Sequence, residues 1–267
     1  MKTVLTITDL TRMQGQRVCV AGVLADGTCV RPVFRSGVLL EDWLQVTRRT
    51  GWFWLRVEKQ VAIRPFARVE FELEVHIPDP PHTEDWVIDP VYRKPCGLLS
   101  PDERQALLTQ ILDPSVESIF GVPLQRGYGY YILSKQGKRS LGTIQPQQIS
   151  AVTFGPGAKE ATKWDYRLAF TDAAGQSYQC AVTDLAFRYF LDSLHTGDHL
   201  SPAEAAHRLT ETLQQAQVFL RIGLARGWEK FPDRCYLQIT GVHSFPDYLA
   251  GRCFADFVSQ DGSLRSE

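Results

Sequence analysis

Apolar and polar residues alternate along much of this chain, and this period of two constrains the fold more than any other feature. Such alternation predicts β-strands, because successive side chains of a strand point to opposite faces. In the segment 61–76, Phe71, Leu73 and Val75 alternate with glutamates. We therefore expect one long strand with a buried face and a solvated acidic face, broken or bulged near its start by Pro65.

Short strands of this kind recur in both halves, with a few helices between them. Further strands are predicted at 2–8, 17–23, 28–33, 128–133, 149–154, 164–170, 178–182, 218–224 and 234–242. Asp26-Gly27 predicts a two-residue hairpin turn that pairs Leu24 with Cys29. Helices are predicted after the capping residues Ser100, Thr183 and Ser201.

The two halves are similar in plan, and 267 residues is enough for two small domains. We predict a mainly β protein with a few inserted helices, built as two OB-like β-barrels. Residues 1–125 would form an N-terminal barrel with an acidic loop and a helix. Residues 126–267 would form a C-terminal barrel with two helices. A single β-sandwich with helical insertions is the alternative.

The charge is balanced overall but uneven along the chain. There are 29 Lys and Arg against 30 Asp and Glu in total. Residues 1–68 hold 11 basic against 5 acidic residues, whereas 69–120 hold 3 against 11. Either one face of the protein suits an anionic partner, or the acidic stretch lies beside the basic one and neutralises it.

The sequence lacks the signals of several functional classes. No apolar run approaches the ~18 residues of a membrane span, and the N-terminal apolar stretch is too short for a signal peptide. We therefore expect a cytoplasmic protein without a membrane partner. The six cysteines show no zinc-site spacing, and no phosphate loop or nucleophile elbow occurs. We expect no metal, no cofactor and no catalytic residues, although an acid–base set of His243, Asp247 and Tyr248 competes with a structural role for that turn.

Three clusters combine aromatic with basic residues. They are Tyr128, Tyr130, Lys135, Lys138 and Arg139; Trp52, Trp54 and Arg56; and Arg221, Arg226 and Trp228. Aromatic rings stack on bases and cationic side chains hold phosphates, so such clusters are typical of single-strand binding surfaces. Each also has a structural interpretation, as core aromatic residues or as arginines paired with nearby acids.

A run near the N-terminus resembles the opening of the dual OB-containing domain family. It reads Arg17-Val18-Cys19-Val20-Ala21-Gly22, then Asp26-Gly27, then Val30-Arg31-Pro32-Val33. Ser140-Leu141-Gly142-Thr143-Ile144, and Val182-Thr183-Asp184 before Phe187, are compatible with later stretches of that family. Cys29-Val30 stands where the family has an aromatic residue before Arg-Pro. The resemblance implies two OB folds, nucleic-acid binding, and an accessory role in bacterial nucleic-acid-processing or defence systems.

These observations favour a non-enzymatic module that binds single-stranded nucleic acid. Two alternatives stay open. The chain could be a protein-interaction subunit of a larger complex, or a nucleotide or small-ligand sensor or enzyme that uses the cleft between the barrels.

Overall fold

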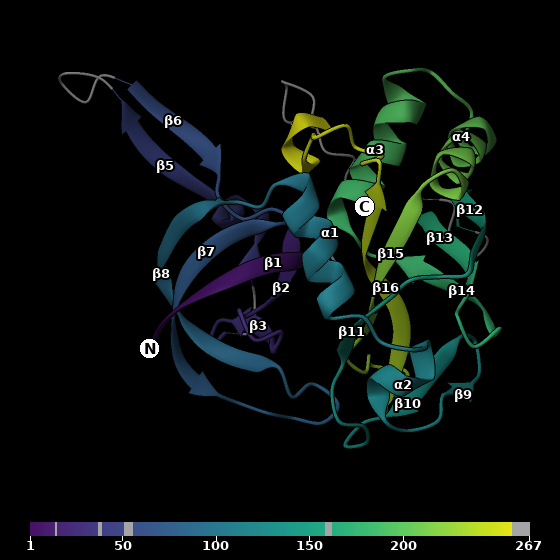
Figure 1. Cartoon of the computed structure of the whole chain (residues 1–267), viewed down its shortest axis with the longest axis horizontal. Helices are drawn as coiled ribbons and strands as arrows, with labels where there is room; N and C mark the ends of the chain where they lie inside the picture. The colour runs from purple at the N-terminus through teal and green to yellow at the C-terminus, as the bar shows by residue number, and fades with distance from the viewer. Residues whose placement is uncertain (14, 37–38, 51–55, 158–161, 258–267) are drawn as a thin grey trace.

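The computed structural model describes residues 1–13, 15–36, 39–50, 56–157 and 162–257, apart from the side chains of 47–50 and 56–60. Two curved β-sheets dominate it, and helices pack mainly around the second (Figure 1). Within these residues, no helix has the length and apolar character needed to cross a membrane.

The first sheet closes into a barrel of five strands. They are β1 (Lys2–Arg12), β2 (Arg17–Val23), β3 (Cys29–Val33), β7 (Ala67–His76) and β8 (Asp85–Leu98). The first three form an antiparallel meander, β3 runs parallel to β8, and β7 pairs with both β8 and β1. This is the OB strand order, a Greek-key barrel. A short strand, a 3-10 turn and a hairpin are inserted between β3 and β7: β4 (Leu39–Leu40), η1 (Glu41–Leu44), β5 (Gln45–Thr50) and β6 (Arg56–Val61).

The second sheet repeats that order in a curled half-barrel. Its strands are β12 (Gln148–Pro156), β13 (Trp164–Thr171), β14 (Ser177–Val182), β15 (Gln217–Leu224) and β16 (Arg234–Phe245). Here too the third strand, β14, runs parallel to the fifth, β16. Three short strands extend the sheet: β9 (Gln125–Arg126), β10 (Tyr130–Leu133) and β11 (Leu141–Ile144), of which β11 pairs with β15 and β10 with β16. The prediction of two OB-like barrels is confirmed.

In the described part of the chain, four α-helices connect or cover the strands. They are α1 (Pro101–Gln110), α2 (Val116–Phe120), α3 (Leu185–Thr196) and α4 (Pro202–Gln214), and a 3-10 turn, η2 (Phe254–Phe257), follows β16. Capping boxes at Ser100 and Ser201 begin α1 and α4, as predicted. The prediction for α3 was wrong by one residue: Asp184, not Thr183, is the N-cap, because its carboxylate accepts from two backbone amides of the first turn.

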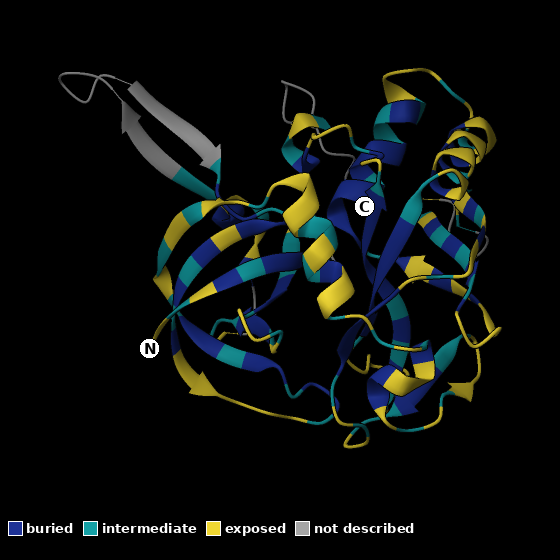
Figure 2. Ribbon diagram, viewed as in Figure 1, coloured by how far each residue is buried: buried dark blue, intermediate teal, exposed yellow. Residues whose placement is uncertain are grey.

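Two strand predictions need correction. The expected strand 61–76 is two strands, because the chain turns between β6 and β7 at Pro65 and at Phe66, whose φ is +66°. Along β7, Phe71 and Leu73 are buried as predicted, but Val75 is 44% exposed. Figure 2 shows the alternating bands of burial on this barrel. The Asp26-Gly27 turn is present, with φ +85° at its glycine, but Val23 pairs with Cys29, so the loop is longer than two residues.

The acidic and basic segments of the N-terminal half lie together. Arg35 Nη2 is 2.8 Å from Glu74 Oε2, and Arg31 Nε is 2.5 Å from Asp85 Oδ1. These pairs favour the interpretation in which the acidic stretch neutralises the basic one.

Helix α3 contributes to both hydrophobic cores. One set of its side chains packs into the first barrel: Leu185, Ala186 and Tyr189. Another set packs into the second: Phe187, Phe190, Leu191 and Leu194. Because one helix completes both cores, the two barrels form a single packed unit.

A buried ion pair joins the barrels. Arg221 of β15 donates from Nε to Asp9 Oδ2 of β1 at 2.9 Å and from Nη1 to Thr143 Oγ1 at 2.7 Å. Thr240 donates to Asp9 Oδ1 at 2.5 Å, and Thr8 donates to Asp9 Oδ2 at 2.6 Å. Burial alone would raise the pKa of Asp9, but Arg221 and the two hydroxyls outweigh burial and hold that pKa below its ordinary value.

Removing one partner of this pair should cost far more stability than removing a surface ion pair. We expect Arg221→Met to lower the free energy of unfolding by roughly 3–5 kcal/mol, because it leaves the Asp9 carboxylate buried and unpaired. Urea unfolding measures this change. Arg208→Met, which removes an exposed pair with Asp198, should cost no more than ~1 kcal/mol. A similar small loss for both variants would contradict the structural role of Arg221.

A histidine at the same seam should make stability depend on pH. His243 Nε2 is 3.0 Å from the Thr8 carbonyl, to which it donates, and burial lowers its pKa to about 4. Between that value and about 6.5 the unfolded chain binds the proton more readily, so His243 makes stability rise with pH. Asp184, whose pKa burial raises to about 7, acts in the opposite sense from about pH 4 to 7.

Comparing the wild-type protein with a His243 variant separates the contribution of His243 from that of Asp184. We expect His243→Gln to remove up to about 3 kcal/mol of pH-dependent stabilisation between pH 4 and 6.5. Thermal or urea unfolding of both proteins across pH 4–8 measures the difference. Parallel curves for the two proteins would show that His243 does not titrate differently on folding.

Candidate nucleic-acid interface

Aromatic and basic side chains gather around a cavity of about 600 Å³ on the second barrel. Its floor is formed by β13, β14 and β16, which are the second, third and fifth strands in OB order. Its rim is formed by Gly157 and Lys163 between β12 and β13, by the β15–β16 loop and by the start of β10. We call its five rings the aromatic platform: Tyr128, Tyr130, Trp228, Phe231 and Tyr236.

Four of the platform's rings contact one another, and two of the five rings are largely open to solvent. Trp228 and Phe231 are edge-to-face at 5.6 Å between centroids, and Phe231 lies 6.3 Å from Tyr128 and 6.4 Å from Tyr236. Tyr128 is 77% exposed and Trp228 is 53% exposed. Large exposed aromatic side chains that are prearranged in this way offer faces on which a flat ligand can stack.

Local sequence fixes the position of Trp228. The Phe231 amide donates to the Trp228 carbonyl at 2.8 Å, which closes a tight turn in the β15–β16 loop. Gly227 precedes this turn, and a Cβ there would lie 2.0 Å from the Pro232 carbonyl oxygen. Only glycine lets the two arms of the loop approach so closely, and the turn therefore presents Trp228 at the rim.

The cavity is bordered more by cations than by anions. Lys163, Arg167 and Lys230 line it, with Asp165 as the acidic residue in its lining. Asp165 lies 3.9 Å from Arg167 Nε. Burial raises the pKa of Cys180 in the floor to about 12, so this thiol is neutral. The border therefore favours a negatively charged ligand.

Three of the sequence-predicted residues meet on this platform. Tyr128 and Tyr130 come from one cluster, and Trp228 comes from another about a hundred residues later. Tyr131, the residue after Tyr130, is buried, and its ring centroid lies 5.5 Å from that of Tyr236 in a tilted arrangement. The alternation of β10 thus sends Tyr130 toward the cavity and Tyr131 toward the interior.

The cations predicted beside these tyrosines lie elsewhere. Lys135 is paired with Asp79 of the first barrel, and Arg139 is paired with Asp113 and donates to the Ile119 carbonyl. Lys138 packs its aliphatic chain near Gly121 after α2. They hold the β10–β11 loop in place and do not line the platform.

The remaining predicted residues are also separate from the platform. Arg221 is fully buried in the seam, so the prediction that it contacts a surface ligand is corrected by its burial. Arg226 pairs with Asp85 and lines a cleft between the barrels. Trp52 and Trp54 lie outside the described residues, and Arg56 begins β6, whose hairpin extends away from the second barrel (Figure 1).

Several lining residues were not predicted from sequence. Phe231, Tyr236, Lys163 and Arg167 belong to a loop and strands whose place in the cavity depends on the OB strand order. The signal available was that order itself: once β12–β16 are assigned, ligands are expected at the second and third strands and their flanking loops.

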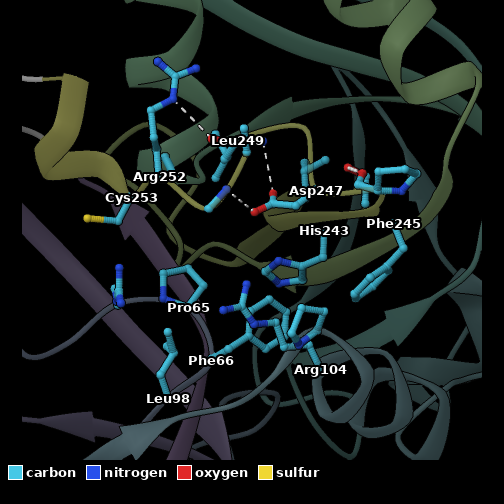
Figure 3. A pocket seen from close by; sticks show the side chains of 18 of the residues that line it. Pro65, Phe66, Leu98, Arg104, His243, Phe245, Asp247, Leu249, Arg252 and Cys253 are labelled. Atoms are coloured by element: carbon cyan, nitrogen blue, oxygen red, sulfur yellow. Dashed lines mark hydrogen bonds between the residues drawn. The ribbon is translucent and has the colours of Figure 1, made fainter.

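The predicted acid–base turn lies at another cavity, of about 390 Å³, between α1 and the end of β16 (Figure 3). The His243 ring is tilted against the Phe66 ring at 4.6 Å between centroids, and the Arg104 guanidinium lies 5.2 Å over the Phe66 ring. Asp247 accepts from the backbone amides of Leu249 and Gly251, which shapes the turn. Because His243 hydrogen-bonds to Thr8 and not to Asp247, these residues form a structural turn.

No group of three or more His, Cys, Asp or Glu side chains is placed to hold a metal ion in the part of the chain that the structure describes.

Comparison with known proteins agrees with the strand order. The family model of the dual OB-containing domain matches residues 2–242, nearly the whole chain. A search of curated proteins finds no match. The family match and the two OB strand orders together show that the chain belongs to the dual OB-containing domain family.

Proposed function

We propose that this protein binds single-stranded nucleic acid on the aromatic platform of its second barrel. One observation carries the proposal: the platform lies where OB folds bind oligonucleotides, at the second and third strands and the loops beside them. The family resemblance adds an accessory role in a nucleic-acid-processing or defence system, and that role is part of the proposal.

The chemistry of the platform fits a single strand better than a duplex. Unpaired bases expose their faces and can stack on Tyr128 and Trp228, which are the two most exposed rings. Phosphates can approach Lys163 and Lys230 at the rim. A duplex would present its bases edge-on and would leave these rings unused.

OB folds also bind oligosaccharides through the same face. A neutral sugar would stack on the aromatic rings but would gain nothing from the cationic rim. The lining holds Lys163, Arg167 and Lys230 against Asp165, and this excess of positive charge favours a polyanion.

Loss of a stacking ring should weaken single-strand binding. We expect Trp228→Ala and Tyr128→Ala each to raise the dissociation constant for a labelled single-stranded oligonucleotide by about tenfold, since stacking contributes ~1–3 kcal/mol per base. Fluorescence anisotropy measures this constant. Tyr92→Ala, which removes a partly exposed tyrosine of β8, is the matched control and should leave binding unchanged.

Wild-type protein that binds no DNA or RNA strand even at low salt would overturn the proposal. Equal loss in Tyr92→Ala would instead show that binding is not located on the platform.

Salt dependence tests the cationic rim separately from stacking. We expect Lys230→Gln to weaken binding to all single-stranded sequences alike and to reduce the slope of log K against log salt by about 0.7. Titrations between 50 and 300 mM salt measure this slope. Trp228→Ala should lower affinity with an unchanged slope, because it removes stacking but no charge. A slope unaffected by Lys230→Gln would place the phosphate contacts elsewhere.

A further inference from the structure

A third cavity, of about 990 Å³, lies between the two barrels. We call it the inter-barrel cleft. Its walls include Arg31, Phe34 and Ile77 from the first barrel, and Leu224, Arg226 and Gln238 from the second. Its size is that of a pocket for a small molecule. Its lining mixes arginines and apolar side chains with two carboxylates, Asp79 and Asp85, which are paired with Lys135 and with Arg31 and Arg226.

The cleft occupies the ligand face of the first OB barrel. Cys19 and Arg31 lie on β2 and β3, the second and third strands, and Met13 and Pro78 belong to the loops beside them. On the second barrel this face is the open platform. On the first barrel, residues 224–227 of the second barrel border it. A long strand therefore has less access here than a compact ligand.

Two arginines converge on one carboxylate at this cleft. Arg31 donates from Nε to Asp85 Oδ1 at 2.5 Å, and Arg226 donates to the other oxygen, Oδ2. The neighbouring Glu84 turns away and accepts from the amide and hydroxyl of Ser140 and from the Leu141 amide. Asp85 is thus shared by two guanidinium groups.

Arg31 has donor capacity that the described residues leave unused. Its side chain is 8% exposed, and its Nη2 has no hydrogen-bond partner among the described residues. Burying such a donor without an acceptor costs about 1–3 kcal/mol, more for a charged group. Arg226 lies beside it with half of its side chain exposed.

A neutral histidine lies near the same two arginines. His82, in the loop before β8, is 3% exposed, and both of its ring nitrogens lack a partner in the described structure. Burial, with the charges of Arg31 and Arg226, lowers the pKa of His82 to about 2. His82 does not line the cleft, but its lowered pKa reflects, besides burial, the positive charge of Arg31 and Arg226.

We propose that the inter-barrel cleft binds the phosphate group of a small phosphorylated molecule, held by Arg31 and Arg226. A phosphate oxygen accepts the bonds that Arg31 Nη2 and Arg226 offer, in the forked geometry that guanidinium groups favour. Phe34, Ile77 and Leu224 provide an apolar wall for the rest of the molecule, which makes a mononucleotide the compound class that fits the lining.

Isothermal titration calorimetry with pyrophosphate, ADP and adenosine tests the proposal on the full chain. We expect ADP and pyrophosphate to bind and adenosine to bind much more weakly. Arg226→Gln should raise the ADP dissociation constant by about tenfold or more, because it removes a charge-assisted hydrogen bond. Arg226 is half exposed, so this variant should fold, and its melting temperature checks that. Arg208→Gln, which removes an exposed arginine of α4, is the matched control.

The outcomes separate this site from the platform. Weakened ADP binding in Arg226→Gln together with unchanged ADP binding in Trp228→Ala places the ligand in the cleft. Full loss of ADP binding in Trp228→Ala, with none in Arg226→Gln, would overturn the proposal and place phosphate contacts on the platform. Absence of binding by ADP and pyrophosphate would also overturn it, whether or not oligonucleotides bind. The protein could bind oligonucleotides but not ADP, and lose the oligonucleotide binding in Arg226→Gln. This result would show that the cleft binds a phosphate of the strand, and it would overturn the small-molecule assignment.

Discussion

The ion pair between Asp9 and Arg221 is the constraint on which the arrangement of the two barrels depends. Both charges are buried. Asp9 accepts from hydroxyl groups of both barrels, Thr8 and Thr240, and Arg221 donates to the Thr143 hydroxyl. A buried pair of this kind contributes little net stability compared with apolar packing, but it tolerates few alternative geometries. It therefore fixes β1 against β15, and β15 leads directly into the loop that borders both cavities.

That loop explains how one repeated fold presents two different surfaces. Leu224 and Arg226 border the inter-barrel cleft, whereas Trp228 and Phe231, a few residues later, belong to the platform. Gly227 stands at the change of direction, where the close approach to Pro232 leaves no room for a side chain. Because the loop borders both cavities, a ligand that shifts the loop in one cavity also changes the wall of the other cavity. The two sites are physically connected without any contact between their ligands.

The strand pattern was predictable where alternation was regular. In β7, Phe71 and Leu73 alternate with glutamates and are buried as expected, whereas Val75, near the end of the strand, is exposed. The long strand β8 gave no such signal, because Pro90, Pro95 and acidic residues interrupt its apolar pattern. Prolines of this kind usually indicate a loop or an edge, and only pairing with β3 and β7 shows that the segment is a strand.

The aromatic members of the site were easier to predict than the cations. An exposed aromatic ring such as Trp228 can stack on a ligand wherever its loop places it. An arginine, by contrast, either faces solvent or pairs with a buried carboxylate, and residues far away in sequence decide which. Arg221 meets Asp9, which lies 212 positions earlier, and Arg226 meets Asp85, 141 positions earlier. Neither partner is visible in local sequence. Both arginines came from one predicted cluster, yet Arg221 is buried in the seam and Arg226 is half exposed at the inter-barrel cleft, because the packing of the barrels decides which carboxylate each one meets.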